Sequence, residues 1–440
     1  MKKYLTILLG MSLVGVQAQK TQQLTLSQAI DLGMKNSRQL MVSDSRSQLA
    51  QAKYDQQRFS TIPALTINSS YNYLSPNVAE AKFPTGLNQY SLVGLTLLNQ
   101  QTNRASLSQT IFAGLRGWNI INATKNQMQA AQLDAQKDQA EVKNNIITAF
   151  YNHYKLTESK QVVDKNIEVL EKRKTDMQNM EKVGMALKND VLKVDLALLN
   201  LKQSAAEVQS ALDISNFNLD VMLGLPEGTI INCATSGLFP SKPNTSVASW
   251  LQTGMNSRPD LKAAVLRRDA ANRMVKVARG GYSPVINAGF NFYYSNPNQR
   301  VFLIQESQRH SYFWSWDIGV SLSWNLTNLF TTTYQIHEAK ANLRQADAAT
   351  AAMNDASRME INANYSAYKL AIDKINMAEK AVEQSTEDQR ITKNQYDNGI
   401  RNITDLLEAD NNITRSQINL VNARIDAEIA YAKLVKAAGN

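Results

Sequence analysis

Two halves of the chain share sequence at a nearly constant spacing. Four residues recur 221 positions later: Leu40, Ala50, Pro63 and Tyr73 match Leu261, Ala271, Pro284 and Tyr294. Five more recur 215 positions later: Gly184, Asp190, Leu192, Asp195 and Gly224 match Gly399, Asp405, Leu407, Asp410 and Gly439. A repeat of about 200 residues far exceeds a solenoid unit of about 20–50, so it indicates duplication of a whole structural half. We expect repeat 1 over residues 19–224, a linker over 225–249 and repeat 2 over 250–440.

The first residues have the pattern of an export signal. Lys2 and Lys3 precede an apolar run from Tyr4 to Val16, and small residues stand at Val16 and Ala18, where a signal peptidase cleaves. We therefore expect residues 1–18 to be a signal peptide. No later stretch approaches the roughly 18–20 consecutive apolar residues of a membrane helix.

The composition favours long regular elements. The 440 residues include only 9 Pro and 18 Gly, which is few for a chain with many loops. The single cysteine, Cys233, falls in a predicted polar loop and cannot form a disulfide within the chain. Lys and Arg form no dense block, so nucleic acid is not an expected partner.

A seven-residue apolar repeat follows each duplicated glycine. The seams of repeat 1 are Val191, Leu198, Ala205, Leu212, Leu219 and Val194, Leu201, Val208, Ser215, Met222. Those of repeat 2 are Leu406, Ile413, Leu420, Ala427, Leu434 and Ala409, Ser416, Ala423, Ala430, Ala437. This period predicts a left-handed coiled coil. With the Pro-free stretches 115–183 and 332–397, it predicts one long helical hairpin per repeat, with tips near Gly184 and Gly399. Shorter helices are expected at about 26–60 and 247–280.

Two β-hairpins are predicted, at about 63–111 and 284–326. Alternating residues predict three of their strands, and the less regular strand near 98–111 is placed by its alignment with residues 312–326. The clearest alternation is that of Trp314, Trp316, Ile318, Val320 and Leu322 with polar neighbours. An apolar face with aromatic ends, opposite a polar face, is typical of a membrane strand beside a wet interior. Any one strand alone also fits a sandwich. Four strands cannot close in lipid, where each unpaired backbone group costs several kcal/mol, so several copies are expected to share one barrel.

Three segments resemble the TolC-like outer-membrane efflux protein family: residues 396–409, residues 183–190 and Arg258-Pro259-Asp260-Leu261. The resemblance extends over nearly the whole mature chain. It implies a mixed, mainly α fold, with a long coiled-coil α-helical barrel continuous with a transmembrane β-barrel. In that family three chains share the barrel and contribute four strands each.

The resemblance also implies a gate at the helical tips. In the family a tyrosine and an arginine link neighbouring helix pairs to an aspartate of the other repeat and hold the tunnel shut. Those positions are Tyr396, Arg401 and Asp190. From physics alone, Asp190 fits a helix start, where the helix dipole favours a negative charge.

Two further sets of residues stand at the tips. Asp405 and Glu408 lie three apart on one helix face, where a solvated coiled-coil flank is the simpler explanation. In a threefold assembly they would form selectivity rings of carboxylates that favour cations. The tips resemble the family's adaptor-docking surface and comprise Val183, Gly184, Met185, Asn398, Gly399 and Ile400.

The function expected is a passive outer-membrane exit duct of a tripartite efflux or type I secretion system, extending into the periplasm. Its partners would be two further copies, a periplasmic adaptor, an inner-membrane pump and outer-membrane lipid. A periplasmic coiled-coil adaptor is the alternative, although such proteins carry one hairpin rather than two. With three histidines, one cysteine and no metal-spaced cluster or phosphate loop, neither an enzyme nor a metal or cofactor is expected.

Overall fold

A computed structural model describes residues 21–75, 81–86, 89–93, 99–234, 245–296 and 311–439. The predicted signal peptide, residues 1–18, lies outside this part of the chain. The chain divides into two compact units. One comprises residues 47–132 and 263–351 and contains the main sheet. The other comprises residues 1–46, 133–262 and 352–440 and contains the tips and the larger part of the helical hairpins.

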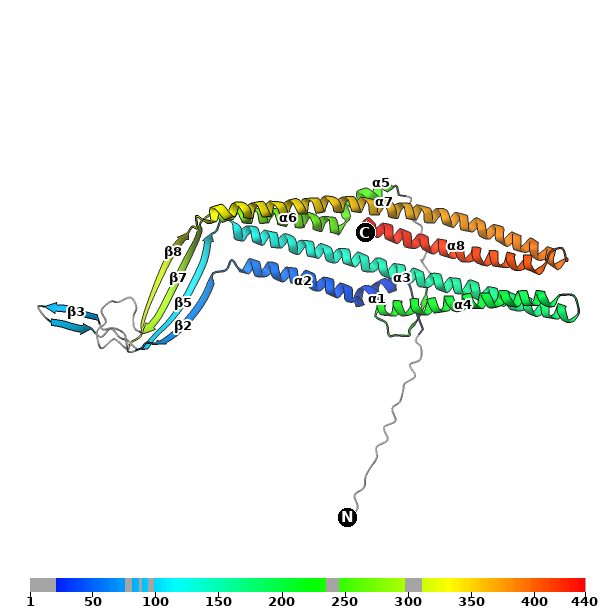
Figure 1. The fold of residues 1–440 in the computed structure, drawn as a ribbon, viewed down its shortest axis with the longest axis horizontal. Helices are drawn as coiled ribbons and strands as arrows, with labels where there is room; N and C mark the ends of the chain where they lie inside the picture. The colour runs from blue at the N-terminus through cyan, green and yellow to red at the C-terminus, as the bar shows by residue number, and fades with distance from the viewer. Residues whose placement is uncertain are drawn as a thin grey trace, which may run out of the picture. The chain divides into compact units, whose positions relative to one another are not determined.

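Four antiparallel strands form the main sheet in the order β2-β5-β7-β8 (Figure 1). They are β2 (Ala64–Tyr73), β5 (Asn99–Phe112), β7 (Val285–Asn296) and β8 (Phe313–Ser323). β2, β7 and β8 lie where the alternation of apolar and polar residues predicts strands, and β5 lies where its alignment with residues 312–326 predicts one. The connection from β2 to β5 contains a second antiparallel pair, β3 (Ala81–Gly86) and β4 (Gln89–Val93). In the described chain, β2 and β8 are the outer strands of the main sheet.

The two faces of this sheet differ in chemistry. Along β8 every second side chain is apolar and more than half exposed: Trp314, Trp316, Ile318, Val320 and Leu322. On the opposite face, Asn291 joins two charged residues of neighbouring strands. The Arg104 guanidinium donates to Asn291 Oδ1 at 2.8 Å, and Asn291 Nδ2 donates to Asp317 Oδ1 at 2.7 Å. The sheet therefore has one apolar and one polar face, as its sequence predicts.

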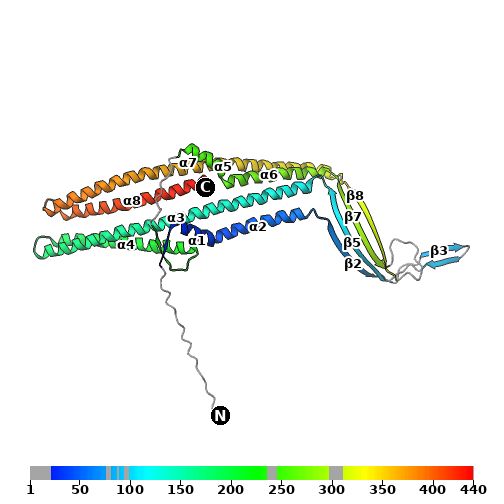
Figure 2. The same ribbon diagram turned by 180° about the vertical axis from the view of Figure 1, so that it is seen from behind.

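Two long helical hairpins lie side by side in both views (Figures 1 and 2), and their tips and larger parts belong to the second unit. The first is α3 (Arg116–Lys182) with α4 (Lys188–Leu223), and the second is α7 (Asn328–Asp397) with α8 (Ile403–Ala437). The predicted seam residues Val194, Leu198, Leu219, Leu406 and Leu434 are all buried. No helix of the described residues has the length and apolarity that a membrane crossing requires.

The two shorter helices predicted at 26–60 and 247–280 are each broken into two. The helices are α1 (Leu26–Asn36), α2 (Arg38–Phe59), α5 (Val247–Ser257) and α6 (Pro259–Arg279), and a one-turn helix follows at Gly280–Tyr282. Pro259 explains the second break, because its ring excludes the helical conformation at Arg258, where ψ is 121°. At the first break Ser37 is extended, and its Oγ accepts from the Leu40 amide.

A small parallel sheet lies partly in the predicted linker. In it β1 (Thr21–Leu24) pairs with β6 (Ile230–Cys233). Ile231 is buried in a core with Phe150 of α3, and the His153 Nε2–H donates to the Ile231 carbonyl at 3.0 Å. Cys233 therefore lies in a strand and not in a polar loop, and burial raises the pKa of its thiol to about 12.

Candidate functional site

The two hairpins turn at their tips through the same backbone motif. In the first, the Gly184 amide donates to the Glu181 carbonyl at 3.0 Å and the Met185 amide to the Met180 carbonyl at 2.8 Å. In the second, the amides of Gly399 and Ile400 make the equivalent bonds to Tyr396 and Gln395 at 2.9 and 2.8 Å. This pattern is the Schellman motif, which needs a left-handed residue after the helix. Gly184 has φ +76° and Gly399 has φ +71°, as the turns require.

The helices that leave the tips begin with an acidic residue in the first turn, Asp190 in α4 and Asp405 in α8. The Asn402 side chain caps α8 by accepting from the Asp405 amide at 3.0 Å. Leu187 precedes α4 and provides no side-chain cap, so Asp190 supplies the stabilising negative charge there.

Beneath the tips, an apolar cluster joins the two hairpins. Its buried members come from α3, α4 and α8: Met177, Val191, Val194, Ile403 and Leu406. Tyr396 packs against this cluster, and its hydroxyl lies 3.8 Å from Met177 Sδ. Burial raises the pKa of the Tyr396 phenol; Arg173 opposes the shift, whereas the charge of Asp190 adds to it.

The structure brings together only part of the predicted gate latch within one chain. Tyr396 and Asp190 lie near enough to interact electrostatically, but the hydroxyl contacts Met177. The Asp190 carboxylate lies 3.5 Å from Lys193 on its own helix. Among the described residues, the exposed Arg401 side chain has no ion-pair or hydrogen-bond partner.

The sequence did not predict an ion pair that joins the two hairpins near Tyr396. Arg173 of α3 and Asp410 of α8 are both nearly buried, with 2.8 Å between Nη2 and Oδ2. The contact does not have hydrogen-bond geometry, so its attraction is mainly Coulombic. Burial raises the pKa of Asp410, while Arg173 and the hydrogen bond from Gln389 of α7 oppose that shift. The pair links the first hairpin to the second.

The predicted ring residues lie close to this ion pair. Asp405 is partly exposed and Glu408 is exposed. Glu408 also lines a groove of about 410 Å³ with Leu407, Asp410 and Thr414 from α8 and with Val169 and Leu170 from α3. Both carboxylates are available to solvent, as a cation-selective ring requires.

The predicted docking tips expose large apolar side chains. Val183, Met185 and Ile400 are each at least 70% exposed, and so is Leu187, which the sequence reasoning omitted. Exposed apolar patches of this kind are typical of surfaces that contact other molecules. Its signal in the sequence is the run of apolar residues around Gly184.

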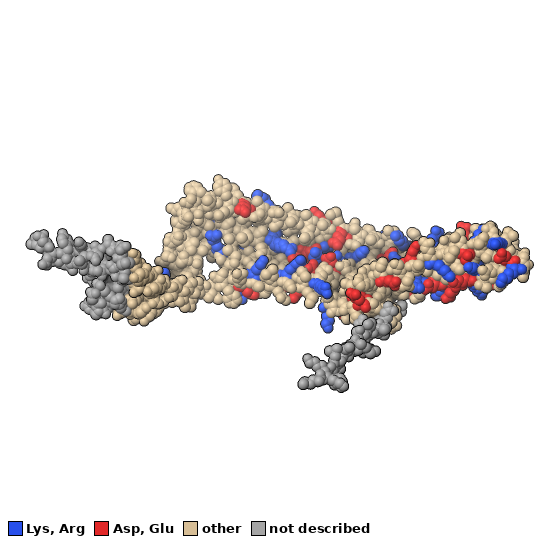
Figure 3. Space-filling model, turned by 60° about the horizontal axis from the view of Figure 1, so that its bottom comes forward, with Lys and Arg blue, Asp and Glu red and all other residues tan. Residues whose placement is uncertain are grey.

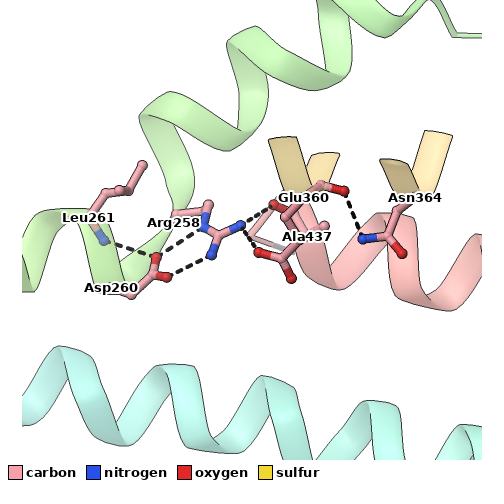
Figure 4. Close-up of polar contacts among 6 residues, drawn as sticks. All are labelled: Arg258, Asp260, Leu261, Glu360, Asn364 and Ala437. Atoms are coloured by element: carbon pink, nitrogen blue, oxygen red, sulfur yellow. Dashed lines mark hydrogen bonds and ion pairs between the residues drawn. The ribbon is translucent and has the colours of Figure 1, made fainter. Parts of the chain in front are cut away.

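A second buried polar cluster occupies the joint between α5 and α6 (Figure 4). The Arg258 guanidinium donates twice to Asp260, and its Nη1 donates to Glu360 Oε2 at 2.7 Å and to the Ala437 carbonyl at 3.1 Å. Desolvation raises the pKa of Asp260, but Arg258 outweighs it and holds that pKa below its usual value. The cluster ties the start of α6 to the middle of α7 and to the C-terminal end of α8, so we assign it a structural role.

No group of three or more His, Cys, Asp or Glu residues in the described chain is arranged to hold a metal ion. The described cavities lie between helices and are lined by mixed polar and apolar side chains.

Residues 250–440 match the family model described as outer membrane efflux protein. Over 347 residues the chain is 23% identical to the outer membrane efflux protein BepC of Brucella suis, covering 76% of this chain and 71% of BepC. The expected resemblance to TolC-like outer-membrane efflux proteins is thereby confirmed.

Solved structures of outer-membrane proteins share the fold. The outer membrane protein VceC of Vibrio cholerae matches with a TM-score of 0.77 and 18% identity, over 94% of this chain and 96% of VceC. The CmeC outer membrane channel of Campylobacter jejuni matches with a TM-score of 0.76 and 16% identity, over 94% and 85%. The mainly helical fold with a separate antiparallel sheet is therefore that of known outer-membrane channels.

Proposed function

We propose that the chain is a passive exit duct assembled from three copies, because its residues 250–440 match the outer membrane efflux protein family model. The sheets of three chains close one twelve-stranded barrel in the outer membrane. The helical hairpins form a tunnel in the periplasm that is gated at its tips. The channel proteins among its structural relatives support this function over that of a periplasmic adaptor.

One observation carries the proposal: the main sheet exposes a face of large apolar side chains, most densely along β7 and β8, and has outer strands with no neighbour in the described chain. In water that face would be costly to expose, and in lipid the open edges would be costly. On the side shown in Figure 3, charged side chains gather over the helices, whereas the sheet is almost free of them. Closing the sheet with other copies satisfies both constraints.

The tips supply the other functional parts. The exposed Val183, Met185 and Ile400 would dock a periplasmic adaptor, through which an inner-membrane pump supplies energy. Rings of Asp405 and Glu408 would surround the narrowest point and favour cations. Tyr396, Arg401 and Asp190 would hold the closed state, with Arg401 reaching a neighbouring copy.

Two substitutions at adjacent positions of β8 test the membrane assignment. Val320 is 75% exposed on the apolar face, so Val320→Arg places a charge in lipid at a cost of about 2–4 kcal/mol near the bilayer midplane. Ser321→Arg places the same charge on the polar face. We expect Val320→Arg to reduce the trimer that migrates intact on unboiled gels of outer membranes. Ser321→Arg should leave the trimer in place and alter conductance in planar bilayers.

The opposite outcome rejects the duct. If the wild-type mature chain is a stable monomer in water without detergent, or if both variants assemble equally, the apolar face does not meet lipid. Insertion of the purified protein into planar bilayers without any channel conductance would also contradict the proposal.

A further inference from the structure

In each hairpin, a polar contact joins the two helices at an equivalent position. In the first, Lys174 of α3 pairs with Asp195 of α4, and in the second Gln389 of α7 donates to Asp410 of α8. Both pairs join residues 21 positions apart, and the second pair lies 215 positions after the first. Asp195 and Asp410 therefore hold equivalent places in the two hairpins.

Asp410 has a further contact that Asp195 lacks. Arg173 reaches it from the other hairpin and buries the pair. The same face of α8 lines the groove against α3 and α4, through Leu407, Asp410, Asn411 and Thr414. One hairpin thus packs on the other through this face of α8.

The equivalent face of α4 is bare in the described chain. The positions 215 before those four residues are Leu192, Asp195, Leu196 and Leu199. Each of the three leucines is at least 55% exposed, and further along α4 so are Ile214 and Val221. An exposed helix face made of large apolar residues is expected to pack against another surface.

The repeat also indicates which helix would pack on this face. The α3 helix packs on the equivalent face of α8, and α7 is the equivalent of α3 in the second repeat, so α7 is the helix expected to pack on α4. In the described structure the side chains of Leu370 and Met377 of α7 are each more than half exposed, and neither belongs to the apolar core that contains Ile361 of the same helix. Position 388, which is 215 after Arg173, is an exposed aspartate with no ion pair among the described residues. Both the α4 face and the α7 face are exposed in one chain, so each can be buried against the other when two copies of the chain pack together.

We propose that α4 of one copy packs against α7 of the next, with Asp388 facing the Lys174–Asp195 pair. This inference rests on the proposed homotrimer and adds the residues of its seams. Within a chain, the interface between the hairpins pairs Arg173 with Asp410. Between chains, the proposed interface places the carboxylates of Asp195 and Asp388 around the single amine of Lys174. The seam between copies is therefore the weaker of the two, and the tunnel opens there first.

Cross-linking tests the contact. In a Cys233→Ser background, Asp195→Cys with Asp388→Cys is treated, in the detergent-purified full chain, with a short bis-maleimide. We expect covalent dimers and trimers on denaturing gels. Lys155→Cys with Asp426→Cys is the matched control, because these residues form an α3–α8 ion pair within one chain with 3.0 Å between Nζ and Oδ1. The control should stay monomeric on the same gels.

A charge substitution tests the chemistry of the seam. Asp388→Arg supplies the arginine that Arg173 supplies within the chain, so the unboiled trimer should withstand a higher temperature than wild type. Asp388→Asn should have a smaller effect in the same direction. A trimer seen by native mass spectrometry that gives no cross-link between chains and no gain from Asp388→Arg would overturn this seam and leave the duct intact. Absence of any oligomer would instead refute the duct itself.

Discussion

Arg173 of α3 and Asp410 of α8 form a nearly buried ion pair that joins the two helical hairpins of one chain, with 2.8 Å between Nη2 and Oδ2. The equivalent aspartate of the first hairpin, Asp195, pairs with Lys174 within one hairpin, and this pair is about one-third exposed. The two pairs thus have the same acid in equivalent places but different solvent access. Because water weakens the attraction between charges, the two pairs should differ in their contribution to stability.

Removing one partner of the buried pair should be costly. Asp410→Ala leaves the Arg173 charge buried without its partner, and we expect a loss of about 3–5 kcal/mol in the free energy of unfolding. Asp195→Ala removes the exposed counterpart and should cost only about 0–1 kcal/mol. Guanidinium denaturation in detergent, followed by far-UV circular dichroism, measures both. Equal losses would show that burial does not distinguish the pairs.

The left-handed glycines of the two tips should resist substitution. An added Cβ at Gly184 or Gly399 would meet no atom within 4 Å, so any cost comes from the backbone alone. We expect Gly184→Ala and Gly399→Ala each to lower stability by about 1–2 kcal/mol. Gly117 has equally open surroundings but lies inside α3, so Gly117→Ala should be neutral or stabilising. Thermal unfolding midpoints test this: those of Gly184→Ala and Gly399→Ala should lie below the wild-type value, and that of Gly117→Ala should not.

Local patterns predicted the elements that depend on neighbours in sequence. The alternation around Ile318 places β8, the seven-residue seam through Leu406 places α8, and the duplicated glycines place both tips. These signals are strong because a whole face of each element is apolar. Tyr396 and Asp190 were found by resemblance, and their proximity in the structure follows from the pairing of the two hairpins.

Other features depend on contacts between distant segments and left no local signal. The β1–β6 pair is only four residues long on each side, and what stabilises it is the burial of Ile231 and the hydrogen bond from His153. Arg173 and Asp410 each look like a solvated flank of a coiled coil until the hairpins are placed together. The breaks at Ser37 and Arg258 needed closer attention to a capping serine and to Pro259.

The buried His153 should make stability depend on pH. Burial lowers its pKa below the ordinary value of about 6.5, and the bond to Ile231 only partly opposes this. Below that ordinary value the unfolded chain binds a proton that the folded chain does not, so stability falls as the pH falls towards the lowered pKa. His153→Gln keeps an N–H donor but cannot titrate.

The comparison is the slope of thermal midpoint against pH, from about 7.5 to 5.5. We expect a shallower decline for His153→Gln than for wild type. His337→Gln removes an exposed histidine of α7 and serves as the control. Parallel slopes for wild type and His153→Gln would contradict the assignment of this titration to His153.

The carboxylate rings should control cations at the tips. Asp405→Asn with Glu408→Gln removes the charge at nearly constant size, so block of the channel by a trivalent lanthanide ion should weaken by about tenfold, or about 1.4 kcal/mol. Planar-bilayer recordings give the blocking concentration. Glu383→Gln neutralises an exposed carboxylate elsewhere on α7 and should leave block unchanged. Equal block in all three proteins would remove Asp405 and Glu408 from the pore.

The latch should limit conductance while it is intact. Arg401→Ser with Tyr396→Phe removes the guanidinium and the phenolic hydroxyl, so the tips lose the contacts proposed to hold neighbouring hairpins together. We expect larger single-channel conductance in planar bilayers, because the closed tips are the narrowest point of the duct. Arg390→Ser is the control, since Arg390 pairs with Glu387 on its own helix at 2.7 Å and is exposed. Wild-type conductance in the double variant would show that these residues do not hold the gate. A rise in the control as well would assign the effect to lost positive charge.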